Sequence, residues 1–309
     1  MSAAQRVMVV GGTGLIGSTV AAELARRGYD VAVAGRHRPE EGSPAAAFAW
    51  VEGDYTRPGW ADRLAGVDAI VFAAAQDIRH VGPHASAETW QDVQTASLPA
   101  FFAEAREAGV RRAVLVGSYY HQVLPDLVAA NAYVRARADA EAGVLALATE
   151  DFVVCAVNPP NVVGVAPGRA LHAFAKMVRW ARGAMADRVP DCAPHGGTNY
   201  MSVHAVAAAV AGAVEHGESG RAYLIGDENL SFQGYFQALF DAAGAERTVA
   251  VCDDDHAFLP DDFLVAGKGV TLSYEPDATE QELLGYHRGD IAQTLRTMVA
   301  AVDALPPRA

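Results

Sequence analysis

The stretch Val7-Met-Val-Val-Gly-Gly-Thr-Gly-Leu-Ile-Gly17 decides the fold, and Ser18-Thr-Val-Ala-Ala-Glu-Leu-Ala-Arg-Arg27 continues it. Four apolar residues predict a buried strand, and the glycines after them predict a tight turn. The Ala-rich segment that follows has the apolar period of an amphipathic helix, which we expect to end at Gly28. The sequence therefore predicts a strand, a turn and a helix in direct succession.

The glycines of this stretch fit two spacings, Gly12-x-Gly14-x-x-Gly17 and Gly11-x-x-Gly14-x-x-Gly17. In both, one glycine makes the turn, one lets the backbone approach a pyrophosphate, and one lets the helix pack closely on the strand. Free amides at the helix start then face the phosphates, together with the positive end of the helix dipole. An ordinary strand-to-helix turn is the alternative. We predict dinucleotide binding by Gly11, Thr13, Gly14, Leu15, Ile16 and Gly17.

Composition and charge exclude several classes of protein. The chain has 309 residues, 51% of them apolar and 20% charged, which is typical of a globular protein with one large domain or two fused ones. Its net charge is −13, and no stripe of Lys and Arg could replace the counterions of nucleic-acid phosphates, so we expect no nucleic-acid partner. No apolar run approaches the roughly 20 residues that span a bilayer, so we expect no membrane partner.

The N-terminus and the cysteines favour a cytoplasmic protein. The first six residues contain no long apolar region, so we expect no signal peptide. The three cysteines are odd in number and far apart, which fits reduced thiols in the cytoplasm. They are Cys155, Cys192 and Cys252.

Two stretches resemble metal sites on paper. His80 and His84 lie among Gly and Pro between residues 76 and 87, but no cysteine or carboxylate stands at ligand spacing, so we expect a loop over the site. The run Cys252-Asp-Asp-Asp-His256 contains adjacent residues, which rarely converge on one ion, so we expect a solvated loop. We therefore predict no metal.

A basic residue stands at the end of the second predicted strand. Val31-Ala-Val-Ala34 runs into Gly35-Arg36, and Arg36 lies nineteen residues after Gly17. In NAD-binding units an acidic residue at about this distance binds the ribose 2′-hydroxyl, whereas a basic residue suits a 2′-phosphate. No acid follows Arg36 before Glu40, so the sequence favours NADP(H) over NAD(H), with Arg36 as a ligand. A basic, solvated strand end is the alternative.

Further candidates for cofactor binding follow the later strands, because ligands of open parallel sheets lie at the carboxyl ends of strands. Residues 48–54 predict a third strand, after which Asp54 and Tyr55 could meet the adenine. Residues 67–75 predict a buried strand whose small final residues leave room for a ligand: Ala73, Ala74 and Ala75. Residues 151–157 predict a strand that runs into a loop fixed by prolines, where the nicotinamide could lie, with Asn158, Pro159 and Asn161 as candidates.

The pattern of elements divides the chain into two parts. Strands and helices alternate over residues 1–163, which predicts a Rossmann-type, doubly wound α/β domain with a parallel sheet. Residues 164–309 predict a smaller, mixed α/β part that binds substrate, with some elements returning to the main sheet. Within these parts, a helix over residues 90–108 contains Pro99, which should kink or divide it, and residues 227–231 predict a turn.

Several short motifs in a fixed order carry a family resemblance. They are Gly11-Gly-Thr-Gly-Leu-Ile-Gly17, Gly53-Asp54, Leu64-Ala-Gly-Val-Asp68, Ala108-Gly-Val110, Asn158-Pro159, Gly220-Arg-Ala-Tyr-Leu-Ile-Gly226 and Leu284-Gly-Tyr286. Together they resemble the extended short-chain dehydrogenase/reductase family, also described as the NAD-dependent epimerase/dehydratase family. The nearest branch is the dihydroflavonol-reductase-like and 3β-hydroxysteroid-dehydrogenase-like one. The resemblance covers nearly the whole chain and implies a homodimer formed by the helix over residues 90–108 and the helix that contains Tyr133.

The resemblance also implies a catalytic serine followed by Tyr-x-x-x-Lys on a helix. The matching residues are Ser118 and Tyr133-Val-Arg-Ala-Arg137, so Arg137 stands where the family has lysine. Four residues separate Tyr133 and Arg137, which places them on one helix face. In the implied chemistry Tyr133 exchanges a proton with the substrate oxygen, Ser118 holds the same oxygen, and Tyr133 and Arg137 contact the cofactor.

The arginine changes what the site can do. A tyrosine with a pKa of about 10 needs a nearby positive charge to titrate usefully near neutrality, and Arg137 supplies one. Arg137 is, however, larger and planar, and it cannot lose a proton to a relay. In the alternative interpretation, Tyr133 only packs beneath a loop and Arg137 is solvated. Tyr119 and Tyr120, directly after Ser118, are reserve candidates for the acid.

We therefore predict an NADP(H)-dependent oxidoreductase that transfers hydride between nicotinamide and a small organic carbonyl or secondary alcohol. The apolar, Ala-rich C-terminal part favours such a substrate over a phosphorylated sugar. One alternative is an epimerase or dehydratase that recycles tightly held NAD. Another is a non-catalytic NADP-binding sensor or partner protein in which Tyr-x-x-x-Arg is a degenerate site.

Overall fold

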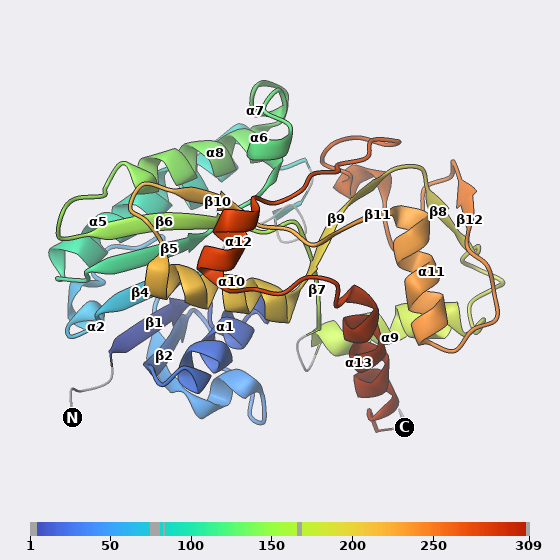
Figure 1. Ribbon diagram of the computed structural model, residues 1–309, viewed down its shortest axis with the longest axis horizontal. Helices are drawn as coiled ribbons and strands as arrows, with labels where there is room; N and C mark the ends of the chain where they lie inside the picture. The colour runs from blue at the N-terminus through green and yellow to red at the C-terminus, as the bar shows by residue number, and fades with distance from the viewer. Residues whose placement is uncertain (1–4, 75–80, 83, 166–168, 307–309) are drawn as a thin grey trace. The chain divides into compact units, whose positions relative to one another are not determined.

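The chain folds into two compact units (Figure 1). The computed structural model describes residues 5–74, 81–82, 84–165 and 169–306. Each unit is assembled from three segments of the chain. Unit 1 comprises Met1–Pro159, Val203–Ile225 and Pro276–Tyr286, and unit 2 comprises Pro160–Ser202, Gly226–Glu275 and His287–Ala309.

Unit 1 has a Rossmann-type, doubly wound α/β fold, which confirms the predicted fold class. Its described residues form a seven-stranded parallel sheet in the order β10-β6-β5-β4-β1-β2-β3. β10 comes from the second half of the chain and pairs with β6. The strands are β1 (Arg6–Val10), β2 (Asp30–Gly35), β3 (Ala49–Glu52), β4 (Ala69–Phe72), β5 (Arg112–Val116), β6 (Val153–Asn158) and β10 (Ala222–Leu224).

Helices cover both faces of this sheet, with α5 and α8 on one face and α1 and α10 on the other (Figure 1). The central strands are apolar along almost their whole length because both of their faces are buried. The helical segments of unit 1 are α1 (Leu15–Arg26), η1 (Pro44–Ala47), α2 (Ala61–Leu64), α4 (Ala87–Trp90), η2 (Gln91–Ala96), α5 (Ser97–Glu107), α6 (Tyr120–Val123), α7 (Leu127–Ala130), α8 (Ala132–Leu145), α10 (Val203–His216) and α12 (Ala278–Leu284).

The helix that was expected to be disturbed by Pro99 changes its winding instead of breaking. It runs from α4 through a π-helical segment, η2, into α5. A proline lacks the amide that would bond the residue four positions earlier, and its ring would clash with that carbonyl. The wider π turn before Pro99 accommodates both effects within one continuous helical rod.

Unit 2 contains two small sheets and a helical core. A three-stranded sheet has the order β11-β9-β7, and a parallel pair joins β12 to β8. Residues 228–231 form strand β11, so the predicted turn at residues 227–231 is wrong; the antiparallel pairing with β9 extends this segment. The elements are β7 (Asn161–Val163), α9 (Arg169–Ala181), β8 (Cys192–Pro194), β9 (Gly197–Ser202), β11 (Glu228–Ser231), α11 (Phe232–Ala242), β12 (Ala250–Cys252), η3 (Asp261–Phe263) and α13 (Ile291–Asp303). In the described ranges every helix is too short or too polar to cross a lipid bilayer.

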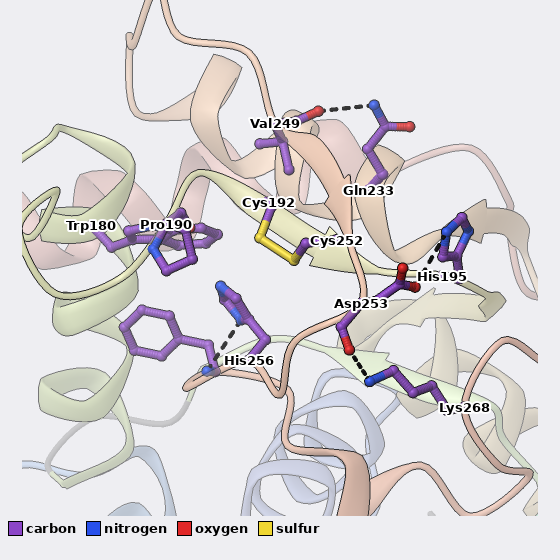
Figure 2. Close-up of a disulfide and its surroundings, with 11 residues drawn as sticks. Trp180, Pro190, Cys192, His195, Gln233, Val249, Cys252, Asp253, His256 and Lys268 are labelled. Atoms are coloured by element: carbon purple, nitrogen blue, oxygen red, sulfur yellow. Dashed lines mark hydrogen bonds and ion pairs between the residues drawn. A yellow bond between two sulfur atoms is a disulfide. The ribbon is translucent and has the colours of Figure 1, made fainter.

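Two cysteines expected as reduced thiols are joined in unit 2 by a disulfide, Cys192–Cys252 (Figure 2). The sequence expectation failed because the two residues are 60 positions apart, and only the pairing of β8 with β12 brings them together. Cys155 is a free thiol in unit 1, and burial raises its pKa to about 12, so it is a poor nucleophile.

The segment after the disulfide is anchored by a buried histidine rather than being solvated throughout. Asp253, Asp254 and Asp255 are exposed as expected, but His256 is 1% exposed. Its ring lies 5.0 Å from the Trp180 ring and 5.2 Å from the Phe236 ring, and the Phe258 amide donates to its Nδ1 at 3.3 Å. Burial lowers the pKa of His256, against the opposing effects of the Pro190 carbonyl and Asp255, so the ring is neutral at pH 7.

Replacing Cys192 and Cys252 together by alanine should lower the free energy of unfolding by about 2–4 kcal/mol, because the bridge closes a long loop in the unfolded chain. Denaturant unfolding with and without a thiol reductant measures this difference. The reductant should destabilise the wild type and leave the double variant unchanged. A wild type that is insensitive to the reductant would contradict the assignment of the bridge.

Candidate active site

The candidate site lies along the carboxyl edge of the sheet in unit 1. All seven strands are parallel, so the segments that leave their carboxyl ends emerge at the same edge. The register pairs Val10 with Phe72 and Ala34, and Val116 with Val157, so these strands end side by side. The glycine turn, the Arg36 and Asp54 segments, and the Ser118 and Asn158 positions therefore share one edge.

The glycine turn is packed backbone against backbone. Gly11 has φ +81°, which favours glycine, and a Cβ there would lie 2.6 Å from the Ala74 backbone and 2.7 Å from that of Ala73. A Cβ at Gly17 would overlap the Gly11 carbonyl oxygen. The turn, the start of α1 and the end of β4 are thus in direct contact, which brings together Gly11, Gly17, Ala73 and Ala74. Ala75 and His80 lie outside the described residues.

The N-terminus of α1 is open to an anion. Gly14 is the N-cap and has no side chain. In the described chain no other side chain caps this helix, and its first turn contains no acidic residue. The amides of Leu15, Ile16 and Gly17 therefore keep their hydrogen-bonding capacity. A helix start of this kind binds phosphate through its amides and dipole. Thr13 is exposed beside it.

Three arginines surround a hollow beside the ends of β2 and β3. The hollow has a volume of about 600 Å³ and is lined by Arg36, Glu52, Gly53, Asp54, Arg57, Pro58, Trp60 and Arg63. Burial opposes the shift, but hydrogen bonds from Thr56 to Asp54, with the charges of Arg36 and Arg57, lower the Asp54 pKa. The Asp54 carboxylate is therefore ionised and turned toward Thr56, while Arg36 and Arg57 are both exposed.

Tyr55 is engaged in the core of unit 1. Its hydroxyl donates to the Val93 carbonyl at 2.8 Å, and its ring lies edge-on to Phe72 at 4.9 Å. Burial raises its pKa to about 12, although the nearby charge of Arg137 acts in the opposite direction. Tyr55 is therefore a neutral packing residue, and its predicted contact with the cofactor remains a prediction.

Tyr133 and Arg137 lie on the buried face of α8, as their spacing predicts. Asn131 caps this helix by accepting from the amides of Tyr133 and Val134, at 3.0 and 3.2 Å. Arg137 is 7% exposed, and its Nη2 donates to the Val116 carbonyl at 3.3 Å, at the end of β5. Among the described residues no carboxylate forms an ion pair with Arg137, so this guanidinium is a buried cation beside the Ser118 segment.

Aromatic rings enclose Tyr133. Its ring centroid lies 5.1 Å from Trp90 and 6.5 Å from Tyr120, and Tyr120 lies 4.3 Å from Tyr119. Ser118 and Tyr133 are 7% and 8% exposed. Tyr119 and Tyr120, the reserve candidates for the acid, therefore belong to the same cluster of rings.

Asn158 is fully buried at the end of β6, and its Nδ2 donates to the Gln122 Oε1 at 2.8 Å. Pro159 is the last residue of the first segment of unit 1, whereas Asn161 starts β7 in unit 2. In the part of the chain that the structure describes, no three His, Cys, Asp or Glu side chains gather as metal ligands.

A family model described as NAD dependent epimerase/dehydratase family matches residues 7–226, which include the glycine turn, Ser118, Tyr133 and Arg137. The chain belongs to the NAD-dependent epimerase/dehydratase family. As a family member it is a nicotinamide-dependent enzyme of the extended short-chain dehydrogenase/reductase type. The family resemblance inferred from the sequence is confirmed.

Solved structures of low sequence identity share this fold. The crystal structure of gox2253 is 22% identical, covers 96% of this chain and 97% of its own, and has a TM-score of 0.74. The UDP-N-acetylglucosamine 4-epimerase from Bacillus cereus is 14% identical, covers 97% and 100%, and has a TM-score of 0.72. MoeE5 in complex with UDP-glucuronic acid and NAD is 19% identical, covers 96% and 98%, and has a TM-score of 0.70. No curated protein matches the chain.

Three side chains near this edge of the sheet were not predicted from the sequence as parts of the site. Arg57 lines the hollow beside Arg36, and a basic residue three positions after Asp54 was the available signal. Glu141 lies on the face of α8 that carries Tyr133 and Arg137, eight residues after Tyr133, and its burial could have been inferred from that spacing. Its partner, His121, could not, because their contact is tertiary.

Replacing Gly14 by alanine should leave folding nearly intact and weaken nucleotide binding at least about tenfold. The new Cβ would meet nothing closer than the Gly11 carbonyl oxygen at 3.4 Å, and φ −80° suits alanine, but the methyl group would stand where phosphates approach the helix. Thermal unfolding and nucleotide titration measure the two effects. Gly17→Ala is the matched control and should damage both, because its Cβ overlaps the turn itself. Wild-type affinity in Gly14→Ala would argue against phosphate binding here.

Proposed function

We propose that this family member is an NADP(H)-dependent oxidoreductase acting on a small organic carbonyl or secondary alcohol. The observation that carries the proposal is the arginine-lined hollow at the ends of β2 and β3, where an NAD-specific unit needs an acid for the ribose hydroxyl. Arg36 and Arg57 are exposed there and unpaired with any carboxylate in the described ranges. Two acids also line the hollow, Glu52 and Asp54, and the Asp54 carboxylate accepts hydrogen bonds from Thr56.

The glycine turn fits the remainder of such a cofactor. The uncapped start of α1 offers amides to a pyrophosphate, and the missing side chain of Gly14 leaves the approach open. The arginine side chains of the hollow then donate charge-assisted hydrogen bonds to the 2′-phosphate. When bound, NADPH supplies the hydride for a carbonyl, and NADP⁺ accepts one from an alcohol.

Two side chains, Tyr133 and Ser118, act on the substrate oxygen. In the direction of reduction, the Tyr133 hydroxyl donates a proton to the carbonyl oxygen as the carbonyl carbon gains hydride, which yields the alcohol. The Ser118 hydroxyl donates a hydrogen bond to the same oxygen and stabilises its developing charge. Proton loss from Tyr133 leaves a phenolate, and the buried guanidinium of Arg137 on the same helix face stabilises that charge.

Arg137 also explains how a site without lysine can work. A buried cation without a carboxylate partner in the described ranges is costly unless a ligand or a phenolate compensates it. One N–H of the planar guanidinium donates to the Val116 carbonyl, and the other N–H groups can donate to ribose hydroxyls or to Tyr133. The charge is therefore permanent, and proton return to Tyr133 passes through solvent or substrate rather than through Arg137.

We infer a small organic substrate rather than a phosphorylated sugar, and the pairing of several arginines in unit 2 is consistent with it. Three arginines of this unit are already paired with carboxylates, which leaves them unsuited to a diphosphate: Arg182 with Asp303, Arg247 with Asp191, and Arg288 with Glu275. This arrangement favours the dihydroflavonol-reductase-like and 3β-hydroxysteroid-dehydrogenase-like branch over one acting on nucleotide sugars.

The proposal includes a homodimer formed through α5 and α8, whose outward faces carry small side chains such as Ala100 and Ala142. Sedimentation or light scattering of the purified protein tests the dimer.

The proposal also includes a cytoplasmic location, although the Cys192–Cys252 bridge is of a kind more typical of oxidising compartments. Alkylation of thiols at the moment of cell lysis reports whether the bridge exists in that location.

Arg36→Asp should reverse the cofactor preference. Losing a charge-assisted hydrogen bond to a phosphate costs about 1.5–3 kcal/mol, which is roughly a tenfold to hundredfold loss in kcat/KM with NADPH. The new acid can accept from a ribose hydroxyl, so kcat/KM with NADH should hold or rise. Arg38→Asp, at an exposed position outside the hollow, is the matched control. Equal losses with both cofactors would refute the role of Arg36.

Tyr133→Phe should lower kcat for ketone reduction by about a hundredfold or more, while NADPH affinity stays within about twofold, because only the proton donor is lost. Stopped-flow oxidation of NADPH with a ketone panel measures turnover. Unchanged turnover would overturn the assignment. Product formation without net consumption of cofactor would indicate an epimerase or dehydratase, and binding without any turnover would indicate a non-catalytic protein.

A further inference from the structure

A hydrogen-bonded pair of side chains connects the helix that carries Tyr133 to the segment that follows Ser118. The Nε2 of His121 lies 3.0 Å from the Oε1 of Glu141, and the two side chains are 13% and 8% exposed. His121 lies on α6, three residues after Ser118, and Glu141 lies on α8, one helical turn beyond Arg137. α6 and α8 pack side by side (Figure 1).

Two further hydrogen bonds join α6 to the sheet. Gln122, next to His121, accepts from Asn158 at the end of β6 at 2.8 Å, and its own amide donates to the Ala222 carbonyl in β10 at 3.2 Å. The helix α6 has only four residues and is too short to be stable by itself. Its position therefore depends on these side-chain contacts, with His121 tied to α8 and Gln122 tied to the sheet.

Gly117 shows how closely these groups surround the Ser118 segment. A Cβ at Gly117 would overlap the Oδ1 of Asn158 and would lie 3.0 Å from the Oε2 of Glu141. Within the described chain, neither of these two oxygens has a hydrogen-bond partner. The residue before Ser118 is thus enclosed between β6 and α8, and any movement of Glu141 changes the space that the Ser118 segment occupies.

We propose that His121 and Glu141 are a pair of positioning residues that fixes the Ser118 hydroxyl relative to Tyr133. Glu141 accepts from His121 and so joins the helix that carries Tyr133 and Arg137 to the turn that carries Ser118. The pair does not touch the substrate and acts through the placement of these two hydroxyls. The inference rests on the proposed function, because it assigns a role within the same reaction.

Removing the pair should affect turnover more than binding. A misplacement of about 1 Å between reacting groups can cost roughly a hundredfold in rate, whereas the glycine turn and the arginine hollow do not involve α6. Glu141→Ala and His121→Ala should each lower kcat about tenfold to a hundredfold, with KM and NADPH affinity within about twofold. The double variant should be no slower than either single variant, because the two residues act as one unit.

Conservative variants separate positioning from general structural support. Glu141→Gln keeps an oxygen that accepts from His121, and His121→Gln keeps a donor near the position of Nε2, so both should retain most of kcat. Asp139→Asn, at an exposed position on the same helix, is the matched control and should behave like the wild type. A similar loss in the alanine and glutamine variants, or additive losses in the double variant, would overturn the proposal.

Amide hydrogen exchange tests the same inference without turnover. In His121→Ala, exchange at the amides of Gln122, Val123 and Leu124, which bond within the α6 turn, should accelerate while α8 stays protected. Unchanged exchange would contradict the positioning role even if the wild type reduced no ketone on the panel. Failure of the proposed function is seen separately, as equal activity in the wild type and Tyr133→Phe.

Discussion

The contact on which the site depends is the packing of backbone against backbone at the glycine turn. Gly11 lies against the Ala73 and Ala74 backbone, and the start of α1 lies against the Gly11 carbonyl, at distances that leave no room for a side chain. This contact fixes the start of α1 against the ends of β1 and β4, so its first amides lie at the carboxyl edge of the sheet. The other parts of the site lie at the same edge, because all strands of a parallel sheet end there.

Positively charged side chains lie at this edge of the sheet, although the chain as a whole is negatively charged. The chain carries a net charge of −13, yet Arg36 and Arg57 line one end of the site and Arg137 is buried at the other. Cations placed where an anionic cofactor would lie can attract it despite the overall repulsion, because interactions beyond about 10 Å are largely screened at ordinary salt concentrations. The same arrangement places the permanent charge of Arg137 on the helix face of Tyr133 without providing a group that can exchange protons.

Local sequence patterns predicted the elements whose causes are local. The strand, turn and helix at residues 7–27 follow from apolar runs and glycine spacing, and the shared face of Tyr133 and Arg137 follows from a spacing of four residues. Features that depend on tertiary neighbours were missed. Cys192 and Cys252 meet only because β8 pairs with β12, and residues 228–231 become a strand only because β9 offers an edge. The contact of His121 with Glu141 likewise depends on where α6 folds back, which no periodicity encodes.

The central claim is that the edge of the sheet in unit 1 binds a pyridine nucleotide that carries a 2′-phosphate. Equilibrium titration of the purified wild type with NADPH and, separately, with NADH tests this claim most directly, because it requires no knowledge of the substrate. We predict saturable binding of both, at least about tenfold tighter for NADPH, with the difference shrinking as salt is added. Equal affinities at low salt would contradict the 2′-phosphate site, and the absence of binding by either nucleotide would contradict the account as a whole.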